Sequence, residues 1–349
     1  MRNNMRAFRG FVGVTWMMVF LSGLFLLVNP DGFTLQDLRN NIFAIKNDTK
    51  VKVKVKINPE ALRYNKLGWS HAGQGQYEQA IAQYSRAIQI DANYSDAYIN
   101  RAWMYFETEQ YDLAIADYSR VLQIDPDHVE AYNLRGWSYA AKEDYDLAIA
   151  NYSRAIALDD RYVASHNNRG IAYQAKGDYG AALKNYNRAI QIKKNHLPAY
   201  YNRGRLYAEQ EQYDQAIQDY DFVLQLDPND VWAYKNRGWA YFNLGQYDQA
   251  IQDYDQAIQL DPNDEWTYLN RGWAYSNKGN YQQAIQEYDR TLQLDPNDVW
   301  AYNNRGWAYF NLGQYDQAIQ DYDRALTLDP TNQNAQINRT LAIQKRDGS

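Results

Sequence analysis

The chain has 349 residues, of which 36 are basic and 42 acidic, giving a formal net charge of −6. It contains no cysteine, which excludes disulfides, thiolate metal sites, a cysteine nucleophile and lipid attachment through cysteine. Residues 1–60 carry nine basic and four acidic side chains, so the rest of the chain has 27 basic and 38 acidic ones, a balance of −11. Because a surface of that sign repels phosphates, we expect no nucleic-acid partner.

The N-terminal residues predict a membrane anchor. Residues 1–9 form a basic tail with three arginines, and residues 10–28 are an uncharged, mainly apolar run. About 18 such residues is the lower end of the length that crosses a bilayer as a helix. We interpret 10–28 as an uncleaved transmembrane signal anchor, with a cleaved signal peptide or a helix lying on the membrane as alternatives.

The arginines before this run favour a cytoplasmic N-terminus and an exported array, as in a bacterial periplasm or cell envelope. Six basic residues between Arg39 and Lys56 oppose that orientation. Residues 29–60 are predicted to be a juxtamembrane linker with a short helix starting near Thr34. The linker continues as a strand-like alternation of lysine and valine from Lys50, which we expect to be a stiff spacer or a contact with anionic lipid.

From Ala61 the sequence repeats every 34 residues. In each unit, places 4, 8 and 11 fall on one side of a helix, and a second helical pattern follows. Prolines then end the second helix, and Asp230, Asp264 and Asp298 stand where they would cap the next one. Each unit is therefore predicted to be helix-turn-helix. The eight units are 61–94, 95–128, 129–162, 163–196, 197–230, 231–264, 265–298 and 299–332.

This pattern resembles the tetratricopeptide repeat (TPR) family, whose period is 34 residues. The places that the family fills with Trp or Tyr, Leu, Gly, Tyr, Ala, Tyr or Phe, Ala and Pro are so occupied across residues 61–332. The resemblance implies an all-α, right-handed superhelix, an α-solenoid, with a concave groove. Residues 333–349 are predicted to form a more polar capping helix and a tail.

One departure from the family pattern recurs along the chain. The seventh place of each unit, where the family usually has leucine, carries arginine in units 2 to 8, and we call this set the arginine ladder. Its members are Arg101, Arg135, Arg169, Arg203, Arg237, Arg271 and Arg305. We predict that they pair with acids on the second helix, such as Asp117, Asp219, Asp253 and Asp321. A role in reading a ligand's carboxylate or phosphate is the alternative.

Aromatic residues collect on the side of the first helix that lines the groove in the family. We call places 2, 9 and 12 of the first helices the aromatic stripe. Its members are Trp69, Trp103, Phe106, Trp137, Trp232, Trp239, Phe242, Trp266, Trp273, Trp300, Trp307 and Phe310. Because aromatic side chains bury much area at recognition surfaces, we predict contact with a ligand. The alternative is that they only pack against the neighbouring repeat.

Asparagine fills the sixth place of most units and forms what we call the asparagine ladder. Its members are Asn100, Asn168, Asn202, Asn236, Asn270 and Asn304. An amide both donates and accepts hydrogen bonds, so it can pair with the backbone of an extended peptide. Bonds to the chain itself or to water are the alternative.

The chain lacks sequence motifs of catalysis. Its four histidines lie in different repeats, and it has no HExxH, phosphate-loop or nucleophile-elbow motif. We therefore expect no catalytic residue, metal or cofactor. The leading hypothesis is a non-enzymatic, membrane-tethered scaffold whose groove binds a peptide or protein segment. A self-assembling structural protein of the cell envelope is one alternative, because units 231–264 and 299–332 differ at only six places. A groove that binds glycans is another.

Overall fold

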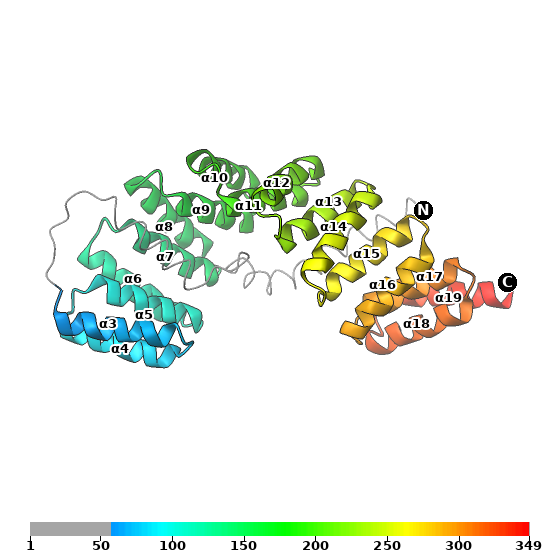
Figure 1. Cartoon of the computed structure of the whole chain (residues 1–349), viewed down its shortest axis with the longest axis horizontal. Coiled ribbons are helices and arrows are strands. Elements are labelled where there is room, and N and C mark those ends of the chain that lie inside the picture. The colour runs from blue at the N-terminus through cyan, green and yellow to red at the C-terminus, as the bar shows by residue number, and fades with distance from the viewer. Residues whose placement is uncertain (1–56, 349) are drawn as a thin grey trace. The chain divides into compact units, whose positions relative to one another are not determined.

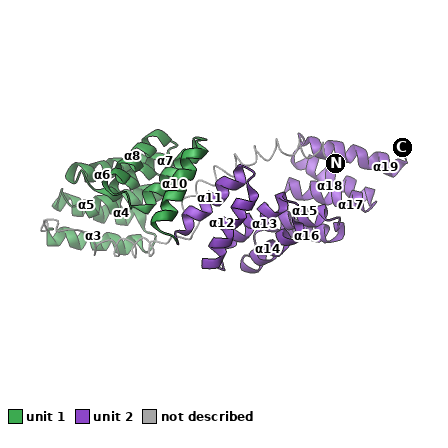
Figure 2. Cartoon of the chain, turned by 90° about the horizontal axis from the view of Figure 1, so that it is seen from above, with its two compact units in different colours: residues 1–194 green, residues 195–349 purple. Residues whose placement is uncertain are grey.

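The computed structural model describes residues 57–348, and every regular element in that range is an α-helix. The chain divides into two compact units, residues 1–194 and 195–349 (Figure 2). The helices of unit 1 are α3 (Pro59–Ala72), α4 (Tyr77–Ile90), α5 (Ser95–Glu107), α6 (Tyr111–Ile124), α7 (Val129–Ala141), α8 (Tyr145–Leu158), α9 (Val163–Ala175) and α10 (Tyr179–Ile192).

Unit 2 continues the same alternation of a first and a second helix, with one helix more. Its elements are α11 (Leu197–Glu209), α12 (Tyr213–Leu226), α13 (Val231–Asn243), α14 (Tyr247–Leu260), α15 (Glu265–Asn277), α16 (Tyr281–Leu294), α17 (Val299–Asn311), α18 (Tyr315–Leu328) and α19 (Gln333–Asp347). Within each unit, every helix packs mainly on its predecessor and its successor in the chain (Figure 1). The prediction of an all-α solenoid of helical hairpins is confirmed.

The predictions for the basic tail, the anchor at 10–28 and the linker up to residue 56 lie outside the described residues. Among the helices of residues 57–348, none has both the length and the apolar character needed to cross a bilayer.

The aspartates that the sequence places before α13, α15 and α17 cap the N-termini of these helices. The side-chain oxygens of Asp230 and Asp298 each accept a hydrogen bond from the backbone N–H three residues on, at 2.8 Å, and that of Asp264 does so at 3.0 Å. These bonds satisfy N–H groups that the first turn of a helix leaves without a partner. The predicted caps of α13, α15 and α17 are therefore confirmed.

The core of each hairpin is a tyrosine of the second helix packed against a small residue of the first. These tyrosines are almost completely buried and are Tyr84, Tyr118, Tyr152, Tyr186, Tyr220, Tyr254, Tyr288 and Tyr322. A Cβ added at Gly272 would lie 2.6 Å from Cε1 of Tyr288, and the other place-8 glycines are similarly close to their tyrosines. The small residue at place 8 is thus what lets the two helices of a hairpin approach.

The tyrosines of the first helices are less buried than their helical spacing predicts. Most of those at places 4 and 11 keep part of their surface exposed, although Tyr98 and Tyr268 are buried. Their rings lie beside the guanidinium groups of the arginine ladder, as in the 5.6 Å between Arg237 Cζ and the ring centroid of Tyr234. They therefore cover charged groups at the edge of the core.

The turns inside the hairpins need one residue in the left-handed region. Glycine holds that place in five hairpins, for example Gly245 with φ 75°, but Glu109, Glu143 and Glu211 adopt it with φ of 58–62°. Left-handed backbone is unfavourable for any residue with a Cβ.

We expect Glu211→Gly to stabilise unit 2 by about 1 kcal/mol, because glycine adopts the left-handed region without strain. The shift of the urea unfolding midpoint measures this effect. Gln210→Gly, one residue earlier at φ −90°, is the control and should not stabilise. An equal gain from both substitutions would contradict the explanation by strain.

Candidate functional site

The aromatic stripe of unit 1 runs along the first helices α3, α5 and α7. The rings of Trp103 and Phe106 stack at 5.7 Å, and both contact Trp137 of the next repeat, at 5.3 and 5.0 Å. Trp69 packs on the cluster that contains Tyr84 and Met104. These side chains are largely used for packing between repeats.

The stripe of unit 2 combines packing with exposure. Trp239 stacks on Phe242 at 5.6 Å and reaches Trp273 of the next repeat at 6.3 Å, and Trp307 stacks on Phe310 at 5.5 Å. The two stacked pairs each lie within one helix, α13 or α17, whereas the tilted contact of Trp239 with Trp273 joins the neighbouring first helices α13 and α15. Trp232, Trp239, Phe242, Trp273, Trp300 and Phe310 are partly exposed.

Two tryptophans of the stripe in unit 2 are open to solvent. Trp266 is 38% exposed and Trp307 is 37% exposed. Large aromatic side chains with that much free surface are favoured anchors for a partner. Unit 2 therefore presents more free aromatic surface on its stripe than unit 1, in which Phe106 is buried and the three tryptophans are partly buried.

The asparagine ladder is partly used by the chain itself. Asn100 Nδ2 donates to Asn65 Oδ1 at 3.0 Å, Asn168 Nδ2 to Asn133 Oδ1 at 3.3 Å, and Asn236 Nδ2 to Tyr201 Oη at 2.8 Å. Each acceptor stands at the fifth place of the preceding repeat, so these bonds connect neighbouring first helices. Asn202 is buried, and Asn270 Nδ2 donates to the Trp266 carbonyl at 2.7 Å.

Several polar atoms on or beside the stripe are buried without a hydrogen-bond partner within residues 57–348. They are the indole N–H groups of Trp103 and Trp273, Oδ1 of Asn270 and Nδ2 of Asn304. A buried donor or acceptor without a partner costs about 1–3 kcal/mol. Three of these four atoms belong to α15 and α17, next to the exposed rings of Trp266 and Trp307.

A buried lysine completes this region, and the sequence pattern did not single it out as a site residue. Lys235 is 6% exposed, and its Nζ lies 4.2 Å from the ring centroid of Trp232 and 5.1 Å from that of Trp266. The same Nζ is 2.9 Å from Asp264 Oδ2. The signal for it was a lysine at place 5 between tryptophans at place 2 of successive repeats. The cation–π contacts and the ion pair hold both indole rings in place.

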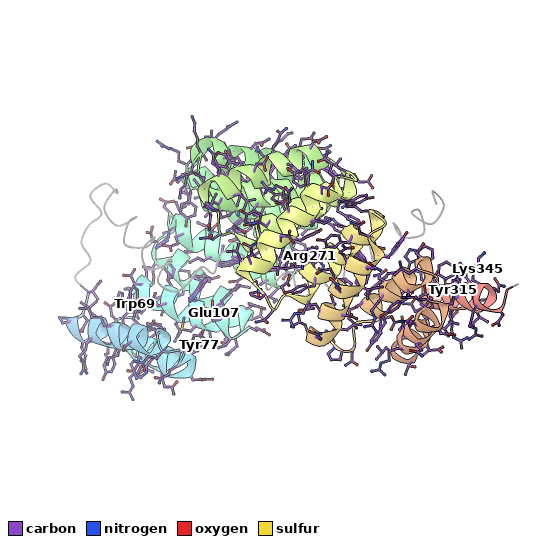
Figure 3. All side chains as sticks on the ribbon, turned by 45° about the vertical axis from the view of Figure 1, so that its right-hand side comes forward. Trp69, Tyr77, Glu107, Arg271, Tyr315 and Lys345 are labelled. Atoms are coloured by element: carbon purple, nitrogen blue, oxygen red, sulfur yellow. The ribbon has the colours of Figure 1, made fainter. Side chains whose placement is uncertain are left out.

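The predicted pairs of the arginine ladder are confirmed at Asp117, Asp219, Asp253 and Asp321. The prediction of an acidic partner is wrong for Arg135 and Arg169, which bond to asparagines. Nη2 of Arg101, Arg203, Arg237 and Arg305 donates to Oδ1 of Asp117, Asp219, Asp253 and Asp321 at 2.6–2.7 Å. A second partner comes from the preceding repeat. Arg271, labelled in Figure 3, donates to Glu287 of its own hairpin at 2.7 Å and to Asp255 of the one before at 2.5 Å.

Burial and the paired carboxylates act in opposite directions on the pKa of these arginines. At Arg101 burial lowers the pKa, but the hydrogen bond and charge of Asp117 raise it by more, so the net shift is upward. The ladder arginines that have an acidic partner are therefore fixed as cations that tie one hairpin to the next.

Comparison with protein families identifies the repeats. Three sequence models match, described as "Tetratricopeptide repeat", "TPR repeat" and a second "Tetratricopeptide repeat". The first matches residues 95–128, 163–196, 231–264 and 299–332, the second 71–103, 136–177, 204–245 and 274–313, and the third 185–218 and 253–286. Together they extend over most of the array. A search of curated proteins finds no significant match.

Solved structures share the fold at low sequence identity. The C-terminal part of a TPR repeat-containing protein from Cytophaga hutchinsonii is 20% identical with a TM-score of 0.58, covering 69% of this chain and 98% of that one. A tetratricopeptide repeat protein from Parabacteroides merdae is 19% identical with a TM-score of 0.52, covering 71% and 98%. A chain of the APC/C hetero-tetramer Cut9–Hcn1 is 18% identical with a TM-score of 0.55, covering 76% and 52%. With its 34-residue hairpins and these matching models, the chain belongs to the tetratricopeptide repeat family.

Proposed function

We propose that the chain is a non-enzymatic scaffold whose aromatic stripe in unit 2 binds an extended segment of a partner protein. Trp266 and Trp307 supply exposed apolar anchors, while Trp239 and Trp273 support them from the neighbouring repeats. Extended peptides present both N–H and C=O groups, which is what a row of mixed donors and acceptors recognises.

The observation that carries this proposal is the exposure of Trp266 and Trp307, at 38% and 37%, beside unpaired polar atoms of α15 and α17. The indole N–H of Trp273 and Nδ2 of Asn304 are donors, and Oδ1 of Asn270 is an acceptor. Because these atoms are covered in the free chain, a bound peptide reaches them and forms hydrogen bonds to them only when the neighbouring side chains shift, while its own side chains contact Trp266 and Trp307. Each such bond recovers part of the cost of the buried, unpaired group.

We also propose that residues 10–28 tether this scaffold to a membrane, with the N-terminus cytoplasmic and the repeats exported. Three arginines before the run and the length of the run support this location. The partner segment would then belong to a protein of the cell envelope.

The test is site-specific photo-crosslinking of the full-length chain in intact membranes. A photoreactive amino acid in place of Trp307 is expected to capture one defined segment of a partner, located by mass spectrometry. The same label in place of Leu113, which is 46% exposed on the second helix α6 of unit 1, is the control and should not capture it.

Trp266→Ala/Trp307→Ala is expected to reduce recovery of the same partner by about tenfold or more in co-purification, because it removes both exposed anchors. Leu113→Ala/Leu147→Ala removes two exposed apolar side chains from second helices and should leave recovery unchanged. Equal recovery with the tryptophan variant and with wild type would overturn the proposed surface.

A further inference from the structure

Two rungs of the arginine ladder differ from all the others. Nε of Arg135 donates to Asn151 Oδ1 at 2.8 Å and Nη1 to Ser119 Oγ at 3.1 Å. Nε of Arg169 donates to Asn185 Oδ1 at 2.9 Å and Nη1 to Ser153 Oγ at 3.0 Å. These partners are neutral, whereas every other ladder arginine within residues 57–348 forms a salt bridge. We call the rungs of Arg135 and Arg169 the neutral rungs.

The asparagines of the neutral rungs leave part of each guanidinium without an acceptor. Asn151 Nδ2 donates to the Leu147 carbonyl and Asn185 Nδ2 to the Ala181 carbonyl, both at 2.8 Å. Each arginine therefore meets a single acceptor atom, the Oδ1 of its asparagine, where an aspartate would offer two. At Arg101 the corresponding aspartate binds both Nε and Nη2. Within the described residues, Nη2 of Arg135 and Arg169 has no such acceptor.

Burial without a carboxylate lowers the pKa of the arginine at one of these positions. The pKa of Arg169 is lowered by burial, while the pKa values of Arg101 and Arg203, which have aspartate partners, are raised overall. A half-buried arginine whose charge has no acidic partner gains more from an added carboxylate than one that is already paired.

The segment of chain around the neutral rungs also has a net positive charge. Residues 129–196, which hold both neutral rungs, contain ten basic and seven acidic residues, a balance of +3. Subtracting these from the 27 basic and 38 acidic residues after residue 60 leaves 17 and 31, a balance of −14 for the rest of the array. The arginines of the second helices here are already paired, Arg154 with Asp127 at 3.7 Å and Arg188 with Asp160 at 3.0 Å. The neutral rungs therefore share the remaining positive charge of this segment with the exposed side chains of Arg161, Lys184, Lys193 and Lys194.

The two neutral rungs are adjacent. Helix α8 contributes to both, because Asn151 belongs to the rung of Arg135 and Ser153 to the rung of Arg169. A single extended segment with acidic side chains therefore has two binding positions one repeat apart. A nucleic acid fits less well, because its charge continues along the whole strand and meets the −14 of the remaining array, whereas a polypeptide can be acidic only where it meets the two rungs.

We propose that the neutral rungs bind the carboxylates of an acidic polypeptide segment, one carboxylate at each arginine. Asn151 and Asn185 stand where Asp117, Asp219, Asp253 and Asp321 stand in other hairpins and bind Nε. The incoming carboxylates instead bind Nη2, the group that the second oxygen of those aspartates satisfies. This site lies where first helices α7 and α9 meet second helices α6, α8 and α10 of unit 1. It is separate from the aromatic stripe of unit 2, so neither proposal depends on the other.

The test uses the full-length chain and a fluorescein-labelled oligoglutamate peptide, with binding followed by fluorescence anisotropy at low salt. Asn151→Asp/Asn185→Asp gives both rungs the internal carboxylate found in other hairpins and is expected to weaken binding about tenfold or more. This variant should unfold at a higher urea concentration than wild type, so a loss of binding cannot come from unfolding. Arg135→Gln/Arg169→Gln is expected to lose binding as well.

Gln74→Glu/Gln79→Glu is the matched control, because it adds the same two negative charges at exposed positions of the first hairpin. It should change the dissociation constant less than about twofold. The proposal is overturned if wild type does not bind the peptide, if Asn151→Asp/Asn185→Asp binds as wild type does, or if the control loses as much. Tighter binding of a single-stranded oligonucleotide of equal charge would overturn the assignment to an acidic polypeptide.

Discussion

Asp253→Ala is expected to destabilise unit 2 by about 3–5 kcal/mol, because it leaves the guanidinium of Arg237 half-buried without its main partner. Asp253 is 4% exposed, and its two oxygens accept from Nε and Nη2 of Arg237 at 2.8 and 2.6 Å. The loss is measured as a shift of the urea unfolding midpoint. It should also appear as faster amide hydrogen exchange in α13 and α14, since repeat arrays open locally.

Asp221→Ala is the matched control for this prediction. Asp221 binds Nη1 of the same arginine at 2.5 Å, but its side chain is 51% exposed. Because water replaces an exposed partner readily, we expect a loss below about 1 kcal/mol. Similar losses from both substitutions would contradict the view that burial decides the strength of each rung.

The ladder also explains how successive hairpins are held against one another. Each arginine binds an acid or amide of the second helix in its own hairpin. In most rungs it also binds a side chain of the second helix in the preceding hairpin, and these two contacts fix the distance between successive hairpins. Burial raises the pKa of Asp253, and Arg237 offsets only part of that rise. The pair therefore recovers only part of the cost of burying the carboxylate, and we attribute its role to fixing the packing between repeats.

The sequence was sufficient for features that lie within one hairpin. The caps at Asp230 and Asp298 and the pair of Arg237 with Asp253 follow from short spacings along the chain, and the 34-residue period follows from counting. The second partner of each ladder arginine, on the preceding hairpin, could not be predicted from the sequence. Asp221 and Arg237, for example, come into contact only when one hairpin packs on the next. Helical periodicity gives the face of a helix but not the rotation between neighbouring repeats.

The same limit applies to the candidate site. Spacing alone placed Trp239 and Trp273 on one face, but it did not separate them from the more exposed Trp266 and Trp307. It also suggested that the asparagine ladder was available to a ligand, whereas Asn100 and several others bond to the preceding repeat. Lys235 was missed because its contacts come from two repeats and a capping aspartate. Each of these details depends on packing between repeats.

Gly272→Val is expected to destabilise unit 2 by about 3 kcal/mol, because a Cβ at this position would lie 2.6 Å from the ring of Tyr288. That ring is almost completely buried and has little room to move. Gly272→Ala adds the same Cβ and should also destabilise, but by less, because it lacks the two further methyl groups of valine and because Ala102 occupies the same place opposite Tyr118 in the second repeat. The measurement is the urea unfolding midpoint followed by circular dichroism.

Gly180→Val controls for the change of residue type. Gly180 also lies in a helix, but the nearest atom to an added Cβ is 3.8 Å away and belongs to the side chain of Asp178. Because valine has a somewhat better helix propensity than glycine, this variant should be neutral or more stable by a few tenths of a kcal/mol. A loss at Gly180 as large as that at Gly272 would mean that valine disturbs the helix itself. A loss confined to Gly272 would show that the approach of the two helices, set by glycine against tyrosine, holds the hairpin together.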